Sequence, residues 1–371
     1  INNNRVTAIF QDHNGIIWIG TDVGGGLNRF DRKKNEYKHY IHDPENPESI
    51  SSNSITVIYE DQQHNLWIGT EGEGLNKFHR DTETFTRYLP DKNNPFAISD
   101  GLIWCIYEDS QVRFWIGTND GLNFFDKDDG TFKKFFAHKN DKNSLTGNTI
   151  RTIYEDLQGY LWIGTLNGLS CLNPSNMTFT QYKNRPEDPK SLNNNEIHSV
   201  YQDSRNRYWI GTGHGLSMFN KQTNEFTAIA EKKGLAGYPV YSIIEDDNNN
   251  LWLSSTSGLS KYNPSDGNYR KYDVYDGLQN NDFMLNASCK IRTGELIFGG
   301  VNGFNIFHPD SVIDNPCIPP VVITNFEIFN KPVNNLTNKV IQQHINYADV
   351  IHLDYDQSVF ISLRSTGLYH A

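Results

Sequence analysis

The sequence contains few cysteines and none of the short motifs that commonly hold metals or cofactors. Its four cysteines, among 371 residues, are Cys105, Cys171, Cys289 and Cys317, and no CxxC pair occurs. The twelve histidines show no HxxxH spacing, and neither a GxSxG nor a P-loop sequence is present. Zinc sites, redox pairs, serine hydrolases and nucleotide-binding loops use these spacings. We therefore expect no metal, no cofactor and buried free thiols.

Positive charge and long apolar segments are also scarce. The chain has 33 Lys and Arg residues against 44 Asp and Glu residues, a net charge of −11. This balance argues against nucleic-acid binding, which needs a basic surface. No stretch approaches the roughly 18 apolar residues of a membrane span, so membrane attachment is expected only through segments outside this chain. No segment keeps an apolar period of 3.6 residues, so no long helix is expected.

One tetrapeptide, Trp-Ile-Gly-Thr, recurs along the chain and is followed each time within a few residues by Gly-Leu. It begins at Trp18, Trp67, Trp115, Trp162 and Trp209, and it weakens to Trp-Leu-Ser-Ser at Trp252 and to Ile-Phe-Gly-Gly around Phe298. By subtraction, the intervals between these aromatic positions are 49, 48, 47, 47, 43 and 46 residues. A period of this length indicates one supersecondary unit copied many times.

Each copy reads as four short strands. In the second copy, β-branched and aromatic runs alternate with turns rich in Gly, Asn, Asp and Pro, and the runs fall at residues 54–61, 66–70, 75–78 and 85–88. Four antiparallel strands at this period predict the blade of a β-propeller. A flat solenoid is disfavoured, because its repeats carry one strand or a helix pair. Blades stacked in a closed ring also bury both apolar faces of every sheet.

Seven copies predict an all-β fold, a seven-bladed β-propeller of four-stranded antiparallel blades, in residues 1–310. The first strands are expected at Val6, Ile55, Ile103, Ile150, Ile197, Val240 and around Asn286. The six tryptophans of the repeat, expected to pack between neighbouring blades, are Trp18, Trp67, Trp115, Trp162, Trp209 and Trp252. The glycine after Trp-Ile is expected to allow close backbone approach or an unusual φ.

The pattern ends irregularly. Pro309 interrupts the seventh copy before a fourth strand, and the chain begins directly at a first strand, without a Met or a signal peptide. We expect the chain to be a piece of a longer protein in which residues upstream of Ile1 supply the missing outer strand. Residues 311–320 contain three prolines and predict a stiff connector. Residues 321–371 contain strand patterns, including 351–355 and 359–363, that predict the first part of a truncated β-sandwich.

The repeat resembles the two-component regulator propeller repeat. The resemblance rests on Asn-x-Ile-x-x-Ile-x-Glu-Asp, Leu-Trp-Ile-Gly-Thr and Gly-Leu-Asn-x-Phe within residues 53–78, and it recurs in register at least six times. Pro320-Val-Val-Ile-Thr-Asn-Phe and the later Leu353-Asp-Tyr-Asp-Gln resemble the Ig-like module that follows such propellers. The resemblance implies the periplasmic sensor region of a hybrid two-component regulator, a homodimer when full-length. It implies a histidine kinase downstream, a preceding propeller that is absent here, and oligosaccharides as ligands that control polysaccharide-utilisation genes.

One position of the first strands varies in a way that a core position rarely does. Aligning the copies places there Thr7, Thr56, Trp104, Arg151, His198, Tyr241 and, in the seventh, Ala287. We expect this position to lie at the mouth of the central channel, where aromatic rings stack on sugars and Arg and His donate hydrogen bonds. For any single residue, an ordinary packing role is the stronger expectation.

A second candidate set follows the second strands. It consists of Asp22, Glu71, Asn119, Asp120, Asn167, His214 and Asn302. These turns and the long loops between blades are expected on one face of the ring, and loops carry function more often than the framework does. The recurring Glu-Asp pairs are interpreted as turn formers, because a catalytic pair is needed once whereas a turn is needed in every blade.

Three functions remain open from the sequence. The leading one is a ligand-sensing module without enzymatic activity, which passes its signal as a change in packing. The second is a propeller lyase or hydrolase acting on polysaccharide, for which His198 with His214 or Glu196 is the available grouping. The third is a protein-interaction scaffold.

Overall fold

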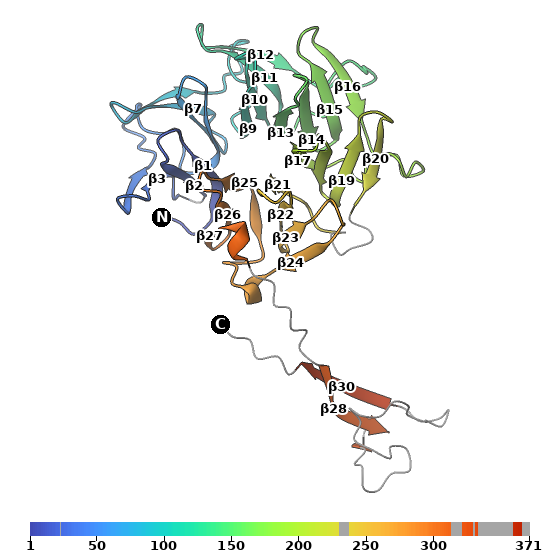
Figure 1. Cartoon of the computed structure of the whole chain (residues 1–371). Helices are drawn as coiled ribbons and strands as arrows, with labels where there is room; N and C mark the ends of the chain where they lie inside the picture. The colour runs from blue at the N-terminus through green and yellow to red at the C-terminus, as the bar shows by residue number, and fades with distance from the viewer. Residues whose placement is uncertain (23, 230–236, 313–320, 329–330, 333–358, 366–371) are drawn as a thin grey trace. The chain divides into compact units, whose positions relative to one another are not determined.

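The computed structural model describes residues 1–22, 24–229, 237–312, 321–328, 331–332 and 359–365 (Figure 1). The chain divides into two compact units, Ile1–Ser311 and Val312–Ala371. The described residues form strands, turns and two 3-10 helices, η1 (Val274–Asp276) and η2 (Pro309–Ser311). None of their helices is long and apolar enough to cross a membrane. The prediction of an all-β chain is confirmed.

Six blades contain four antiparallel strands each, hydrogen-bonded in sequence order. Blade 1 contains β1 (Val6–Gln11), β2 (Ile17–Thr21), β3 (Leu27–Asp31) and β4 (Glu36–Tyr40), and blade 2 contains β5 (Ile55–Glu60), β6 (Leu66–Thr70), β7 (Leu75–His79) and β8 (Thr84–Tyr88). Blade 3 contains β9 (Ile103–Glu108), β10 (Phe114–Thr118), β11 (Gly121–Asp126) and β12 (Thr131–Phe135), and blade 4 contains β13 (Ile150–Glu155), β14 (Leu161–Thr165), β15 (Gly168–Asn173) and β16 (Thr178–Tyr182). Blade 5 contains β17 (Ile197–Gln202), β18 (Tyr208–Thr212), β19 (Gly215–Asn220) and β20 (Glu225–Ala228), and blade 6 contains β21 (Ser242–Glu245), β22 (Leu251–Ser255), β23 (Gly258–Tyr262) and β24 (Tyr269–Tyr272).

Blade 7 has three strands among the described residues, β25 (Phe283–Lys290), β26 (Leu296–Gly300) and β27 (Gly303–Phe307). The 3-10 helix at Pro309 follows β27, as the break in the repeat predicted. The first strands of successive blades contact one another around the ring, and β25 contacts β1 through the parallel pair Ala8 and Asn286. Figure 1 shows the resulting ring, which confirms the seven-bladed β-propeller.

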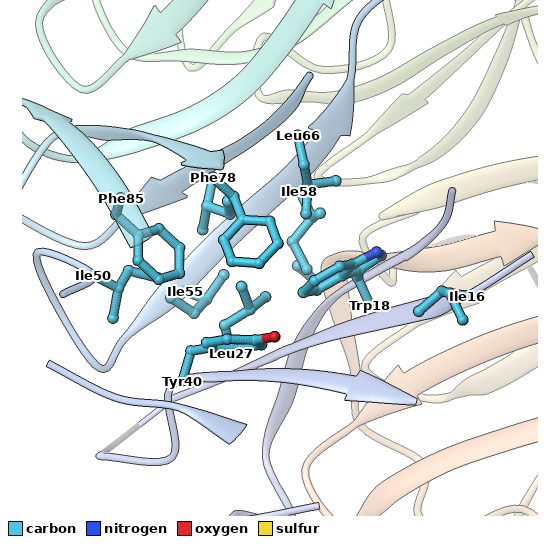
Figure 2. Close-up of a cluster of buried hydrophobic side chains, with 12 residues drawn as sticks. Ile16, Trp18, Leu27, Tyr40, Ile50, Ile55, Ile58, Leu66, Phe78 and Phe85 are labelled. Atoms are coloured by element: carbon cyan, nitrogen blue, oxygen red, sulfur yellow. The ribbon is translucent and has the colours of Figure 1, made fainter. Parts of the chain in front are cut away.

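The repeated tryptophans pack between blades, as predicted. Trp18 is fully buried and clusters with Ile58, Leu66 and Phe78 of blade 2. Its ring meets the Phe78 ring edge-on, with 5.2 Å between centroids. Figure 2 shows side chains of blades 1 and 2 pointing toward one another around this indole. Each tryptophan therefore supplies a large apolar surface that the next blade covers.

The glycine after Trp-Ile serves close approach rather than an unusual φ. A Cβ added at Gly20 would lie 2.6 Å from a methyl group of Ile55, in the next blade. Gly69 stands in the same relation to Ile103, with 2.7 Å to its Cβ. Neither glycine has a positive φ. A larger residue at these two positions would push adjacent blades apart, whereas blade 6 has the small residue Ser254 in the same place.

Each repeat tryptophan is also tied to the turn that precedes it. Its indole Nε1 donates to the aspartate six residues earlier, at 2.8–3.0 Å in all six blades. The same carboxylate accepts backbone N–H groups of its own turn, those of Gln63 and Asn65 in the case of Asp61. The aspartates are Asp12, Asp61, Asp109, Asp156, Asp203 and Asp246, and all six are buried.

The residue before that aspartate connects neighbouring blades. The Glu60 carboxylate accepts the backbone N–H of His13 from blade 1 at 2.7 Å, and Glu108 accepts that of Gln62 from blade 2 at 2.7 Å. Gln11 closes the ring by accepting the N–H of Arg292 from blade 7 at 2.9 Å. The recurring acids thus hold the framework together, which is a structural role and not a catalytic one.

The second unit is described only in part. β28 (Val321–Ile328) pairs antiparallel with β29 (Lys331–Pro332) and β30 (Val359–Ser365). β30 matches the strand predicted at residues 359–363, and β28 lies within the segment 321–371 for which strand patterns were predicted. The predicted strand at residues 351–355 and most of the connector 311–320 lie outside the described residues.

The cysteines of the described residues are free thiols, and two of the three are buried as expected, whereas Cys289 is partly exposed. Cys105 and Cys171 are buried in two different blades, and burial raises the pKa of each thiol to about 12. They are therefore protonated at neutral pH and unreactive. Cys317 lies outside the described residues.

Val112 occupies a backbone conformation that suits it poorly. Its φ is 63°, in the left-handed region, where a β-branched residue is strained, whereas Asn206 and Asn249 hold the equivalent turn position in blades 5 and 6. We expect Val112→Asn to raise the free energy of unfolding by about 1 kcal/mol, measured by chemical denaturation. Ile41→Asn is the control, because Ile41 is also exposed and has no positive φ. An equal gain in both variants would contradict the strain argument.

Candidate functional site

The variable position of the first strands is an extra residue in the strand. In blade 4, Ile150 pairs with Thr165 and Thr152 with Gly164, so Arg151 between them has no partner in the neighbouring strand. The same skip leaves out Thr7, Thr56, Trp104 and His198 in their blades. A β-bulge of this kind re-aims a side chain and is common beside functional sites. Because the first strands contact one another around the ring, these residues lie near its centre, where the sequence predicted a channel.

Both candidate sets lie toward the same face. The backbone N–H of Asp22 donates to Arg5 O at 3.1 Å, and that of Glu71 donates to Ser54 O at 3.0 Å, so the end of each second strand adjoins the start of the first. We call the face that carries these turns and the connections between blades the loop face. The opposite face, with the turns after first strands, is the turn face.

The structure gives the two threonines of the ring a framework role. Thr7 Oγ1 donates to Ile55 O, and Thr56 Oγ1 donates to Ile103 O, each at 2.5 Å. Each bond joins one blade to the next. Blade 7 contributes Asn286, whose Nδ2 donates to Thr56 O at 3.0 Å and to Trp104 O at 2.6 Å. This part of the ring is occupied by bonds between blades.

The other four residues form a different arrangement. The Arg151 guanidinium carbon lies 3.6 Å from the centroid of the Trp104 ring, and the His198 ring meets the Tyr241 ring edge-on at 5.2 Å. Trp104 Nε1, Arg151 Nε and His198 Nδ1 are buried and have no hydrogen-bond partner among the described residues. The structure therefore brings these residues of blades 3–6 together and leaves polar atoms of three of them unsatisfied.

Burial also controls the charges in this arrangement. Burial, with a smaller contribution from the nearby positive charge of Arg151, lowers the pKa of His198 to about 4. His198 is therefore neutral at pH 7. Burial also lowers the pKa of Arg151, although a guanidinium remains charged at neutral pH. The channel thus holds one positive charge beside a neutral imidazole.

The second candidate set lies on the loop face in more exposed positions. Asp22 is half-buried and forms an ion pair with Arg5 at 3.5 Å. Asp120 accepts a hydrogen bond from Asn148 at 2.9 Å, and Asn302 donates to Gln279 O at 3.3 Å. The exposed members are Glu71, Asn119, Asp120, Asn167, His214 and Asn302. Their contact with a ligand stays a prediction.

The sequence alignment misplaced blade 7 by one residue. Ala287 is buried against Gly299, the equivalent of the contact between Ala8 and Gly20, and it does not face the channel. Asn286 holds the channel position instead. The eight-residue strand β25 has a register shift between Phe283 and Ser288, which spacing alone did not reveal.

A histidine cluster on the turn face was also missed. His13, Glu60 and His64 offer ligand atoms that lie within 4.8 Å of one another, and the two imidazoles stack at 4.0 Å between centroids. The signal was the presence of His13 and His64 in the same turn of consecutive blades. Glu60 already pairs with Arg80 at 2.6 Å and with His13 at 2.6 Å, so its carboxylate has partners without a metal.

The first two strands of blades 1–6 match a known repeat. The family model described as two component regulator propeller matches residues 1–23, 49–72, 97–120, 144–167, 191–214 and 234–257. The chain carries six two-component regulator propeller repeats. This confirms the resemblance drawn from the sequence for the propeller.

Several proteins are similar to this propeller chain. The extracellular domain of the hybrid two component system BT3049 from B. thetaiotaomicron is 29% identical, with a TM-score of 0.71 over 91% of this chain and 43% of that chain. Histidine kinase P4 from Formosa agariphila is 32% identical over 91 residues, which are 24% of this chain and 7% of that protein. This chain therefore spans less than half of the first and a small part of the second.

Propeller enzymes share the fold. A streptogramin B lyase has a TM-score of 0.60 and 14% identity, over 83% of this chain and 95% of that chain. At this identity the likeness concerns the fold alone. The enzyme alternative must therefore be judged on the residues of this chain.

Proposed function

We propose that this chain is a ligand-sensing domain of a hybrid two-component regulator, that it is periplasmic, and that it has no catalytic activity of its own. The ligand is an oligosaccharide, which binds where the channel reaches the loop face and thereby controls polysaccharide-utilisation genes. The observation that carries the binding site is the set of unsatisfied buried polar atoms at Trp104, Arg151 and His198. Similarity to the extracellular domain of BT3049 supports the sensor role.

The wider protein is part of the same proposal. Residues 311–320 form a connector, residues 321–371 begin an Ig-like β-sandwich, and the full-length protein is a homodimer with a histidine kinase beyond this chain. A sensor of this design passes its signal through packing between domains, which needs a ligand that binds one packing state more tightly than another.

The channel suits binding better than proton transfer. The unpartnered His198 imidazole is neutral at pH 7, because burial lowers its pKa, and its ring is packed against Tyr241. None of the hydrogen bonds seen for the described residues joins His198 to a carboxylate that could orient it, as a general base usually requires. Glu196 and His214 are exposed on the loop face.

We expect an oligosaccharide to raise the melting temperature of the chain. At a ligand concentration of one hundred times Kd, the gain in stability is about 2.7 kcal/mol. A thermal-shift panel of plant and animal oligosaccharides provides the test, with Tyr241→Ala reducing the shift. Tyr275→Ala is the matched control, because Tyr275 is 83% exposed in η1 and outside the ring. No shift with any glycan would contradict the proposal, and product formation abolished by His198→Ala would favour the enzyme.

A further inference from the structure

Buried polar atoms without a hydrogen-bond partner are concentrated among the residues of the variable first-strand position. In the described part of the chain, five buried side-chain N or O atoms lack a hydrogen-bond partner, and three of them belong to Trp104, Arg151 and His198. These residues hold the same bulge position in the consecutive blades 3, 4 and 5. Buried polar atoms without partners are costly, so a cluster of them at one position indicates a ligand that forms hydrogen bonds with them.

Arg151 differs from the partly buried cations that lie beside the repeat aspartates. On the turn face, Arg80 pairs with Asp12 at 2.8 Å, and Lys127 pairs with Glu108 at 2.6 Å. The guanidinium of Arg151 has no ion pair among the described residues, and Glu196, the carboxylate whose charge acts on it, does not come within ion-pair distance. A partly buried cation without an anion carries a desolvation cost that a bound anion would offset.

The stacked geometry prepares this cation for a planar anion. The guanidinium carbon lies over the Trp104 ring, 3.6 Å from its centroid, and Arg151 Nε has no hydrogen-bond partner among the described residues. A guanidinium edge presents parallel donors that match the two oxygens of a carboxylate. A neutral sugar hydroxyl accepts at one point and does not neutralise the charge.

We propose that the ligand carries a carboxylate, as a uronic acid residue does, and that Arg151 binds it through the edge of its stacked guanidinium. This inference rests on the proposed function, because it specifies the ligand of the same channel. Trp104 holds the guanidinium plane, and Trp104 Nε1 and His198 Nδ1 lie in the same ring to bind neighbouring sugar oxygens.

The surroundings of the channel set a further condition. Glu71, Asp120 and Glu196 are exposed acids on the loop face, so the entrance does not attract anions from a distance. Selectivity must come from the short-range contact with Arg151. Salt screens exposed charges more than buried ones, so binding of the acidic sugar should not fall steeply as salt rises.

The test is calorimetric titration of the full chain with matched pairs of disaccharides. The members of a pair differ only in having a carboxylate or a hydroxymethyl group, as digalacturonate and galactobiose do. Pairs based on several different uronic acids are compared. We expect the wild type to bind one acidic member at least tenfold more tightly than its neutral counterpart. Arg151→Gln should make the two affinities equal. Arg185→Gln is the control and should keep the preference, because Arg185 lies exposed in a loop between blades and pairs with Asp188.

The outcomes separate the two proposals. Equal or tighter binding of a neutral member by the wild type overturns the carboxylate assignment but leaves the sensor proposal standing. A preference for the acidic member that survives in Arg151→Gln overturns the role of Arg151. Binding of no pair overturns the carboxylate assignment, and the wider glycan panel then decides the sensor proposal. Circular dichroism of Arg151→Gln confirms that lost binding does not reflect unfolding.

Discussion

Trp67→Ala is expected to lower the free energy of unfolding of the propeller by about 3–5 kcal/mol. The Trp67 ring is 1% exposed and lies 5.0 Å from the Phe114 ring and 5.6 Å from the Phe125 ring, both in blade 3. Truncation removes this contact between blades and leaves a cavity. Because the ring is closed, the cavity can be filled only if whole blades move. Chemical denaturation followed by far-UV circular dichroism measures the loss.

Trp104→Ala provides the matched control for this prediction. Trp104 is the tryptophan outside the repeat, it is half-buried, and its ring contacts Arg151 rather than a neighbouring blade core. Its truncation should cost clearly less than that of Trp67. Equal losses in the two variants would mean that the repeat tryptophans have no special role between blades.

Much of the fold could be predicted because its determinants are local and copied. A strand pattern that is ambiguous in one copy becomes decisive when it recurs in register. Because Trp67 occupies the same position in its copy as the other repeat tryptophans, the sequence already predicted that it lies between blades. The hydrogen bond from the Trp67 indole to Asp61 could not be predicted in the same way. The sequence shows Asp six residues before each Trp, but that spacing also fits a simple turn, and the meeting of the two side chains depends on the blade geometry.

The site was predicted less completely for a physical reason. Variation among Thr56, Trp104, Arg151 and His198 marked the position, but only the register shows that each is a bulge residue without a partner in the neighbouring strand. The sequence could not show which of these residues bond neighbouring blades and which are left without a partner. The role of Thr56, for example, depends on a carbonyl of the next blade. The stack of Arg151 on Trp104 also joins two blades, and no local pattern encodes it.

Blade 7 shows how the aspartate and tryptophan depend on each other. There Ile291 and Ile297 stand where the other blades have Asp and Trp, and both are buried. Replacing both members of a hydrogen-bonded pair by apolar groups can be nearly neutral, whereas removing one leaves the other unsatisfied. The chain therefore contains either the complete polar pair or none of it, which predicts a large cost for a single replacement.

Asp61→Ala is accordingly expected to cost about 2–4 kcal/mol, because it leaves the buried Trp67 indole and the N–H groups of its own turn without an acceptor, while Lys127 keeps its ion pair with Glu108. Although burial alone raises the pKa of Asp61, hydrogen bonds from Trp67 and Asn65 and the charge of Lys127 lower it below 3.8. A carboxyl with a lowered folded-state pKa stabilises the protein above its unfolded value and loses that contribution as the pH falls through the folded one. The deficit of Asp61→Asn should therefore be largest near pH 7 and shrink below about pH 4. The exposed Asp81→Asn should show little deficit at any pH, and a pH-independent deficit for Asp61→Asn would contradict this account.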